Sequence, residues 1–164
     1  GPEMKSTGEA MGHGPNFGTA YLKAMKGGNK KLPTKGTVFL SISNKLKLEF
    51  GNIAQELIDL GFNFIATKGT AAHLRKKGIK SKIIWRISDK KQPDILSIMR
   101  RGNVDLIINL PTGRRAATDG AQMRRLAVEL GIPFITTLTG AKAAIYSLKE
   151  GEKDYLEPLK KIKY

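Results

Sequence analysis

The sequence predicts an α/β domain built on a doubly wound, Rossmann-like sheet of five parallel strands flanked by helices on both faces. From residue 34 onward, short apolar runs rich in β-branched residues alternate with longer amphipathic segments, which is the pattern of strand and helix in succession. The most apolar run, at 105–110, has the composition of a central strand covered on both faces. Parallel strands need right-handed crossovers, so helices are expected on both sides of the sheet.

Each expected strand is a run of β-branched and apolar residues bounded by turn-forming residues. The pattern places the strands at 37–42, 62–66, 82–85, 105–110 and 133–136. Between and after them, apolar residues recur at helical spacing. Helices are therefore expected from Phe50 to Leu60, over 71–77, from Pro93 to the residue before Gly102, from a cap at Thr118 or Asp119 to Leu130, and over 141–149.

Residues 1–33 differ in character from the rest of the chain. They are rich in Gly, Lys and small polar residues, contain one short expected helix at 16–26, and end in the breaker-rich stretch 27–33. We interpret them as an arm and a linker, and residues 34–164 as the folded domain. With 164 residues and 40% hydrophobic content, one domain can bury a core without disulfide bonds or metals.

The composition excludes several classes of function. The chain has no cysteine and two histidines, so disulfide bonds, thiolate chemistry and a histidine-built metal site are not expected. No apolar run reaches the roughly 20 residues that a membrane helix needs, and residues 1–10 lack the layout of a secretory signal. A cytoplasmic protein with no membrane partner is therefore expected.

The formal net charge of +15 predicts that the chain attracts anions. Its basic residues are scattered in small groups, as expected of solvated helix faces. Nucleic-acid binding would add stacking aromatic residues or a recognisable reading motif. Since only 7% of the residues are aromatic and no such motif occurs, no nucleic-acid partner is expected.

Ligands of doubly wound sheets bind outside the carboxyl ends of the strands, so the residues just after each strand are candidates for a site. In this sequence they are mostly hydroxyls, amides, glycines and cations. Such groups suit a phosphate, because hydroxyls and helix N-terminal N–H groups donate to its oxygens while Lys and Arg supply charge. These positions include Ser41, Ser43, Asn44, Lys47, Thr67, Lys68, Gly69, Thr70, Arg86, Ser88, Asn109, Thr112, Arg114, Thr136 and Thr137.

Acidic residues suited to general catalysis are scarce among these positions. Asp119 is expected to cap a helix, Asp94 to lie in a helix first turn, and Asp105 to open a strand. We expect Asp89 to be a solvated loop acid and His73 to be a partly exposed structural histidine. The sequence therefore predicts a binding site without catalytic residues.

Two motifs at the strand ends resemble a known family. Residues 65–71 read Ile-Ala-Thr-Lys-Gly-Thr-Ala, and residues 107–115 read Ile-Ile-Asn-Leu-Pro-Thr-Gly-Arg-Arg. Both are similar to the methylglyoxal-synthase-like domain, in the version that ends carbamoyl-phosphate synthase large subunits. Residues 3–12 separately resemble the stretch that closes the second synthetase unit of that subunit. The resemblance thus divides the chain into a synthetase tail and linker at 1–33 and an allosteric domain at 34–164.

The resemblance implies a regulatory role in arginine and pyrimidine biosynthesis. The full glutamine-dependent synthase would make carbamoyl phosphate using ATP with Mg or Mn, whereas this fragment would hold no cofactor and carry no catalysis. Its partners would be the rest of the large subunit and the glutaminase small subunit. The resemblance leaves open whether the chain also forms an oligomer. Its effectors would be the nucleotides UMP and IMP, with ornithine acting nearby.

The resemblance also implies roles for individual residues. Four of them, Lys47, Thr67, Thr70 and Arg86, would hold the phosphate, while Asn109 would meet the ribose and Thr136 would lie near the ornithine junction. The whole expected effector set is Lys47, Thr67, Lys68, Gly69, Thr70, Arg86, Asn109, Thr112, Arg114 and Thr136.

The expected base pocket departs from the bacterial members of the family. Pro111 stands where they commonly have a ligand-contacting Thr, and Thr112 is its expected substitute. Gly120 replaces a Ser, and Gln122 and Met123 also differ. The resemblance therefore supports the phosphate subsite more strongly than the identity of the base.

Three alternatives stay open. Methylglyoxal synthase shares the fold, but Gln92 falls roughly where its catalytic aspartate belongs. The inosine-monophosphate cyclohydrolase domain has an opening pattern that residues 41–45 partly match, but its Lys-Thr-Leu-His-Pro segment is absent. A free-standing phosphate or nucleotide sensor is the stronger rival, because the sequence does not show the parent protein.

Overall fold

Five parallel strands form one sheet in the order β3-β2-β1-β4-β5. The computed structural model describes residues 32–111 and 114–162, with side chains described over 32–111 and 118–151. The expected arm at 1–31, with its helix at 16–26, lies outside the described residues. The predicted fold class, a doubly wound five-stranded α/β sheet, is confirmed.

The sheet is buried at its centre and short at its edges. Its strands are β1 Gly36–Ile42, β2 Phe62–Ala66, β3 Lys82–Ile83, β4 Leu106–Leu110 and β5 Phe134–Ile135. In β1, Leu40 pairs with Ala66 of β2 and with Ile108 of β4. The edge strand β3 is shorter than the predicted run 82–85, because the Trp85 N–H bonds the Pro93 carbonyl at 3.2 Å and leaves the ladder.

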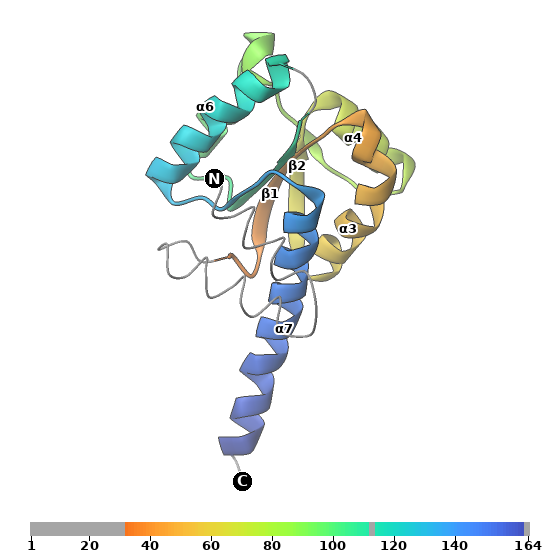
Figure 1. The fold of residues 1–164 in the computed structure, drawn as a ribbon, viewed down its shortest axis with the longest axis vertical. Coiled ribbons are helices and arrows are strands. Elements are labelled where there is room, and N and C mark those ends of the chain that lie inside the picture. The colour runs from red at the N-terminus through yellow and green to blue at the C-terminus, as the bar shows by residue number, and fades with distance from the viewer. Residues whose placement is uncertain (1–31, 112–113, 163–164) are drawn as a thin grey trace.

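Helices cover both faces of the sheet (Figure 1). One face packs against α3 Lys47–Asp59, α4 Lys68–Lys76 and α7 Leu138–Ile162, and the other against α5 Ile95–Arg100 and α6 Arg114–Leu130. Successive residues of a strand point to opposite faces. Leu40 therefore belongs to the core under α3 and α7, whereas Phe39 belongs to the core under α5 and α6. Leu32, assigned to the linker from the sequence, is 2% exposed and packs in the first of these cores.

Four helices begin earlier than the sequence predicts. α3 starts at Lys47 instead of Phe50. α4 starts at Lys68 instead of 71, which makes Lys68, Gly69 and Thr70 its first turn. α6 starts at Arg114, so Asp119 lies inside it, and the expectation that Thr118 or Asp119 caps it is wrong.

α7 begins at Leu138 and continues past 149 to Ile162, beyond the sheet (Figure 1). Its early start has a local cause: the Thr137 hydroxyl accepts a hydrogen bond of 2.9 Å from the Gly140 N–H and so caps the first turn.

Candidate anion-binding cleft

A cleft of about 690 Å³ opens at the carboxyl ends of β1 to β4. Because β1 lies between β2 and β4, the chain winds outward in opposite directions from it, and this switch point is where doubly wound sheets bind ligands. The cleft brings together seven of the ten predicted effector residues, namely Lys47, Thr67, Lys68, Gly69, Thr70, Arg86 and Asn109.

The ammonium group of Lys47 is one of the cations that line the cleft. Lys47 is the first residue of α3, and its Nζ donates to the Asn44 side-chain oxygen at 2.6 Å. A Cβ on Gly69 would lie 3.3 Å from this Nζ, so a side chain there would crowd the ammonium against the first turn of α4. Partial burial lowers the pKa of Lys47 below its usual value, because it disfavours the charged form.

Thr67 and Thr70 form the floor beside Lys47. Both are buried, and the Thr67 hydroxyl donates to the Thr70 hydroxyl at 3.2 Å. The Thr70 oxygen also accepts from the Ile42 N–H at 3.0 Å, which joins α4 to the end of β1. The first turn of α4 contains no acidic residue, so its free N–H groups and positive dipole end are left for an anion.

Asn109 lies at the carboxyl end of β4 and is 4% exposed. It packs against α6 at Gly120, where an added Cβ would lie 2.9 Å from the Asn109 amide nitrogen. Gly120, which the sequence marked as a departure from relatives, therefore provides the space that this amide occupies.

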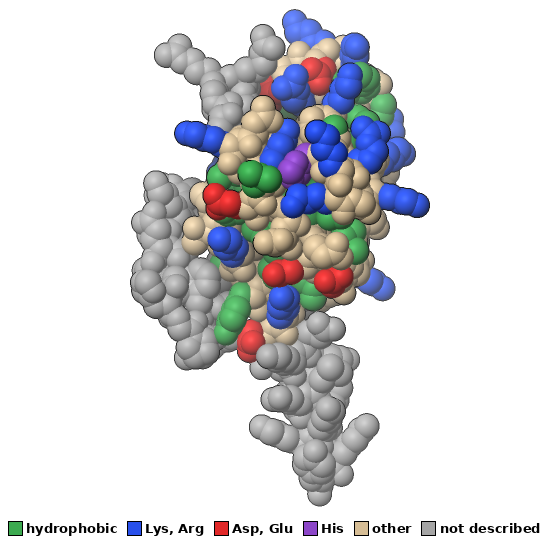
Figure 2. Space-filling view, turned by 90° about the vertical axis from the view of Figure 1, so that its right-hand side faces the viewer, with side chains coloured by type: hydrophobic (Ala, Val, Ile, Leu, Met, Phe, Trp, Pro, Cys, Tyr) green, Lys and Arg blue, Asp and Glu red, His purple; other side chains and the backbone are tan. Residues whose placement is uncertain are grey.

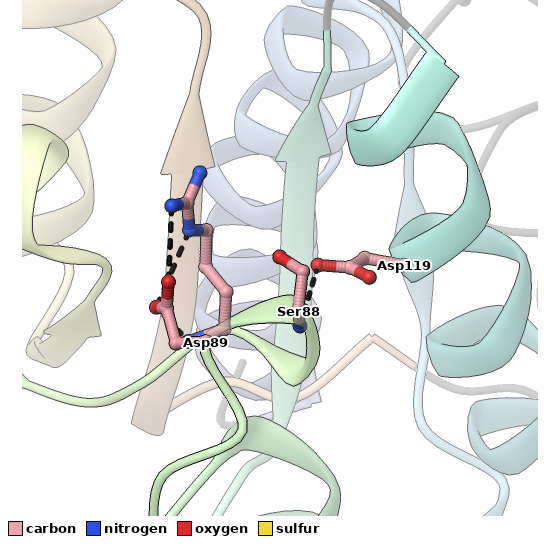
Figure 3. Close-up of polar contacts among 4 residues, drawn as sticks. Ser88, Asp89 and Asp119 are labelled. Carbon is pink, nitrogen blue, oxygen red and sulfur yellow. Dashed lines mark hydrogen bonds and ion pairs between the residues drawn. The ribbon is translucent and has the colours of Figure 1, made fainter.

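Arg86 and Asp89 form an ion pair in the cleft, around η2 Ile87–Asp89 (Figure 3). The guanidinium donates from Nη2 to Asp89 Oδ1 at 3.1 Å and from Nε to Oδ2 at 3.4 Å, while the Arg86 backbone N–H donates to Oδ2 at 3.0 Å. These bonds stabilise the ionised forms, so the pKa of Asp89 is lowered and that of Arg86 is raised. The expectation that Asp89 is a solvated loop acid is wrong.

Asp119 is a second carboxylate that lines the cleft. It is 8% exposed, and its Oδ2 accepts from the Ser88 N–H at 3.2 Å, which ties α6 to η2 (Figure 3). Asp89 and Asp119, two of the carboxylates that the sequence places nearest the strand ends, both line the cleft. The cleft thus contains a lysine with a neutral partner, an arginine paired with a carboxylate, and a second carboxylate.

Two further hydroxyls line the cleft, those of Ser43 and Ser88. Both oxygens are buried, and neither has a hydrogen-bond partner among the described residues. Buried polar groups are usually satisfied, so these hydroxyls are ready donors for a bound molecule. Their strand-end positions were the signal in the sequence, but the family resemblance did not select them.

The cleft also contains Trp85, which the sequence reasoning missed as a site residue. The Lys91 ammonium lies 4.5 Å from the centre of its ring, a cation–π contact. No strand-end motif singled out Trp85, because the sequence pattern placed it inside the expected strand 82–85.

Three predicted residues are not brought into this arrangement. Thr136 follows β5 and does not line the described part of the cleft. Thr112 lies outside the described residues, and Arg114 begins α6 but its side chain is likewise not described.

Basic residues cover the surface around α4. No acidic residue occurs between Asp59 and Asp89. The exposed cations of this stretch are Lys68, Arg75, Lys76, Lys77, Lys80, Lys82 and Arg86. Figure 2 shows Lys and Arg predominating on the upper part of this face. Such a field raises the local concentration of anions near the cleft.

Two other kinds of site find no support in the described residues. No group of three metal-ligating side chains occurs among them, and no described helix has the length and apolarity needed to cross a bilayer. His73 is half-buried in α4, and its Nε2 has no hydrogen-bond partner within the described part of the chain.

Comparison with known proteins places this fold and cleft in a family. Residues 49–136, more than half of the chain, match the model of the MGS-like domain. The chain therefore belongs to the MGS-like domain family.

Similar proteins within the family include carbamoyl phosphate synthase large chains. The C-terminal section from Methanocaldococcus jannaschii is 47% identical over 149 residues, which cover 91% of this chain and 24% of the relative. The C-terminal section from Methanopyrus kandleri is 44% identical over 150 residues, 91% of this chain and 28% of the relative. The large chain from Archaeoglobus fulgidus is 47% identical over 150 residues, 91% of this chain and 14% of the relative.

These matches confirm the resemblance to the MGS-like section of carbamoyl phosphate synthase large chains. The chain spans less than a third of the length of each of these three relatives.

Proposed function

We propose that this chain is the regulatory section of a cytoplasmic, glutamine-dependent carbamoyl phosphate synthase, and that its cleft binds a nucleoside monophosphate such as UMP or IMP. The observation that carries the proposal is the meeting of Lys47, the first turn of α4 and Asn109 in one cleft. Charge, free N–H groups and an amide are the groups that recognise a phosphate and a ribose.

The different partners of Lys47 and Arg86 favour one orientation of the nucleotide. The phosphate would lie near Lys47 and the first turn of α4, where no acidic side chain competes for the cation. The ribose and base would extend toward Asn109 and Asp119, whose oxygens accept hydrogen bonds from hydroxyl and N–H donors. A volume of about 690 Å³ falls in the range usual for small-molecule sites.

A role in regulation, without catalysis in this section, fits the state of the acidic groups. Asp89 is ionised and paired with Arg86, which makes it a weak base. Gln92, which stands near the position of the methylglyoxal synthase aspartate, bonds to Asp94 at 3.3 Å and does not line the described cleft. ATP and its Mg or Mn ions would then belong to the synthetase units of the full enzyme.

Regulation would work by population shift. A nucleotide that prefers one arrangement of this section relative to the synthetase units biases the enzyme by its difference in affinity for the two arrangements. Such coupling typically amounts to about 1 to 3 kcal/mol. The partners would be the remainder of the large chain and the glutaminase subunit, with ornithine acting near Thr136.

Calorimetric titration of the chain with UMP and IMP, at low and moderate salt, tests the proposal. Thr67→Ala and Lys47→Ala remove a hydroxyl and the ammonium group at the cleft, and we expect both to abolish or strongly weaken saturable binding. Lys45→Ala is the matched control, because Lys45 is an exposed cation two residues away that does not line the cleft.

Equal weakening by Lys45→Ala would contradict a specific site and indicate general attraction of anions. Saturable binding that survives both cleft substitutions would contradict the assignment of the phosphate to this cleft. In the full synthase, a rate and affinity that respond to no nucleotide would contradict the regulatory role.

A further inference from the structure

The cleft contains two kinds of cation that differ in their partners. Lys47 has a neutral partner, the amide oxygen of Asn44 at 2.6 Å. Arg86 is the single arginine among the described residues that line the cleft, and it has a charged partner, Asp89. An incoming anion therefore meets one cation that has a neutral partner and one that is already paired with a carboxylate.

The Arg86–Asp89 pair is held by the turn that contains it. Arg86 immediately precedes η2 and Asp89 is its last residue, and the Asp89 carboxylate accepts from the Arg86 backbone N–H at 3.0 Å as well as from the guanidinium. This backbone bond holds the carboxylate at the turn independently of the position of the guanidinium. The carboxylate is thus positioned as a permanent competitor for the arginine.

Asp119 strengthens the negative surroundings of Arg86. The main cause of the raised Arg86 pKa is its hydrogen bond to Asp89, and the charge of Asp119 adds to it. Asp119 is itself fixed by the Ser88 N–H at 3.2 Å. An anion near Arg86 must therefore overcome an existing pair in a negative field.

We infer that Asp89 acts as a built-in counter-anion that occupies Arg86 and weakens the binding of phosphate-bearing effectors in this cleft. The inference rests on the proposed function and deepens it. Asp89 sets how tightly the effector binds, and Arg86 contributes to binding only after it exchanges its carboxylate partner for the effector phosphate. The side chain of Arg86 is 52% exposed, so it has room to make this exchange.

The expected effect of removing the competitor is modest. Exposed ion pairs are worth about 0.2 to 1 kcal/mol. Asp89→Asn should therefore tighten the binding of phosphate and of UMP by about 1.4- to five-fold. The substitution keeps an oxygen that can accept from the Arg86 backbone N–H, so the turn should be preserved.

A double-mutant cycle separates competition for Arg86 from a general change in charge. The full chain is titrated with inorganic phosphate and with UMP as wild type, Asp89→Asn, Arg86→Gln and the double variant. Competition predicts that Asp89→Asn tightens binding when Arg86 is present and has no such effect in the Arg86→Gln background. Equal tightening in both backgrounds would overturn the inference, because a changed overall field does not need the arginine.

Two other results have distinct meanings. Saturable binding by the wild type that Asp89→Asn leaves unchanged or weakens, with circular dichroism and melting temperature preserved, overturns this inference alone. The absence of saturable binding in all four proteins overturns the proposed function and the inference with it. Asp89→Ser, which retains an oxygen acceptor on a shorter side chain, repeats the test if the Asn variant melts early.

Discussion

The hydroxyl of Thr70 accepts a hydrogen bond of 3.0 Å from the backbone N–H of Ile42, the last residue of β1. Both residues are buried, so this bond ties the first turn of α4 to the strand end beneath the cleft. Thr70 therefore has a structural role in addition to its proposed contact with phosphate.

Replacing Thr70 by Val should destabilise the protein. Val has nearly the same shape but no acceptor, so the buried Ile42 N–H loses its partner, and we expect a loss of about 1 to 3 kcal/mol in the free energy of unfolding. Urea denaturation measures this change. Thr70→Ser is the control, because it keeps the hydroxyl and removes one methyl group, with an expected loss of about 0.8 kcal/mol. A Val variant as stable as the Ser variant would contradict the structural role.

Effector binding should depend on pH through Lys47. The protonated ammonium binds the anion, and burial lowers the Lys47 pKa from 10.5. Affinity should therefore be full below the pKa in the free protein and fall as the pH rises through it, at a lower pH than for an ordinary lysine. A phosphate monoester stays dianionic throughout this range, since its second pKa is about 6. Binding near the Lys47 pKa should take up a proton.

Substitution of Lys47 tests this assignment. Lys47→Met keeps the length of the side chain and removes its charge. A hydrogen bond to a charged group contributes about 1.5 to 3 kcal/mol, so affinity at neutral pH should fall about ten-fold or more. Calorimetry in buffers of different ionisation enthalpy measures both the affinity and the proton uptake. A Met variant that keeps the early fall in affinity with pH would show that another group titrates.

Gly120→Ala should disturb the amide of Asn109. The new Cβ would lie 2.9 Å from the Asn109 amide nitrogen, so the side chain must rotate away. An off-rotamer side chain costs about 0.5 to 1.5 kcal/mol. We expect weaker binding of UMP with little change for inorganic phosphate, which does not reach the amide in the proposed orientation.

Ala121→Ser is the matched control for Gly120→Ala, since Ala121 is exposed one residue further along α6 and does not line the cleft. Calorimetry with the two ligands gives the comparison. An equal loss for UMP and for phosphate would place the phosphate, rather than the ribose, near Asn109.

Local patterns in the sequence predicted much of the site. The rule that ligands bind at the carboxyl ends of parallel strands selected Lys47, Thr67 and Asn109, because each follows or ends an apolar run that is easily recognised. The same patterns misplaced helix starts. Thr118 and Asp119 have the residue types of a helix cap, yet the helix begins at Arg114.

Such local patterns do not predict contacts between segments that are distant in the sequence. Ser88 and Asp119 are 31 positions apart, and their hydrogen bond exists because α6 packs beside η2. The Arg86–Asp89 pair is local, but a turn of this shape had no clear signal, since its αL residue is Lys90 with φ of 52° instead of a glycine.

The sequence by itself determined the order of strands and helices along the chain, the polar and basic residues at the strand ends that suit a phosphate, and the family. These depend on the period of apolar residues and on short motifs, which need no knowledge of the partner segments. Only the tertiary structure decided the charge layout of the cleft: Lys47 beside a neutral amide, Arg86 beside Asp89, and Asp119 facing Ser88. The reason is physical, because the backbone turns after β1 and β3 set the two local pairs, and the packing of α6 beside η2 brings Asp119 to Ser88.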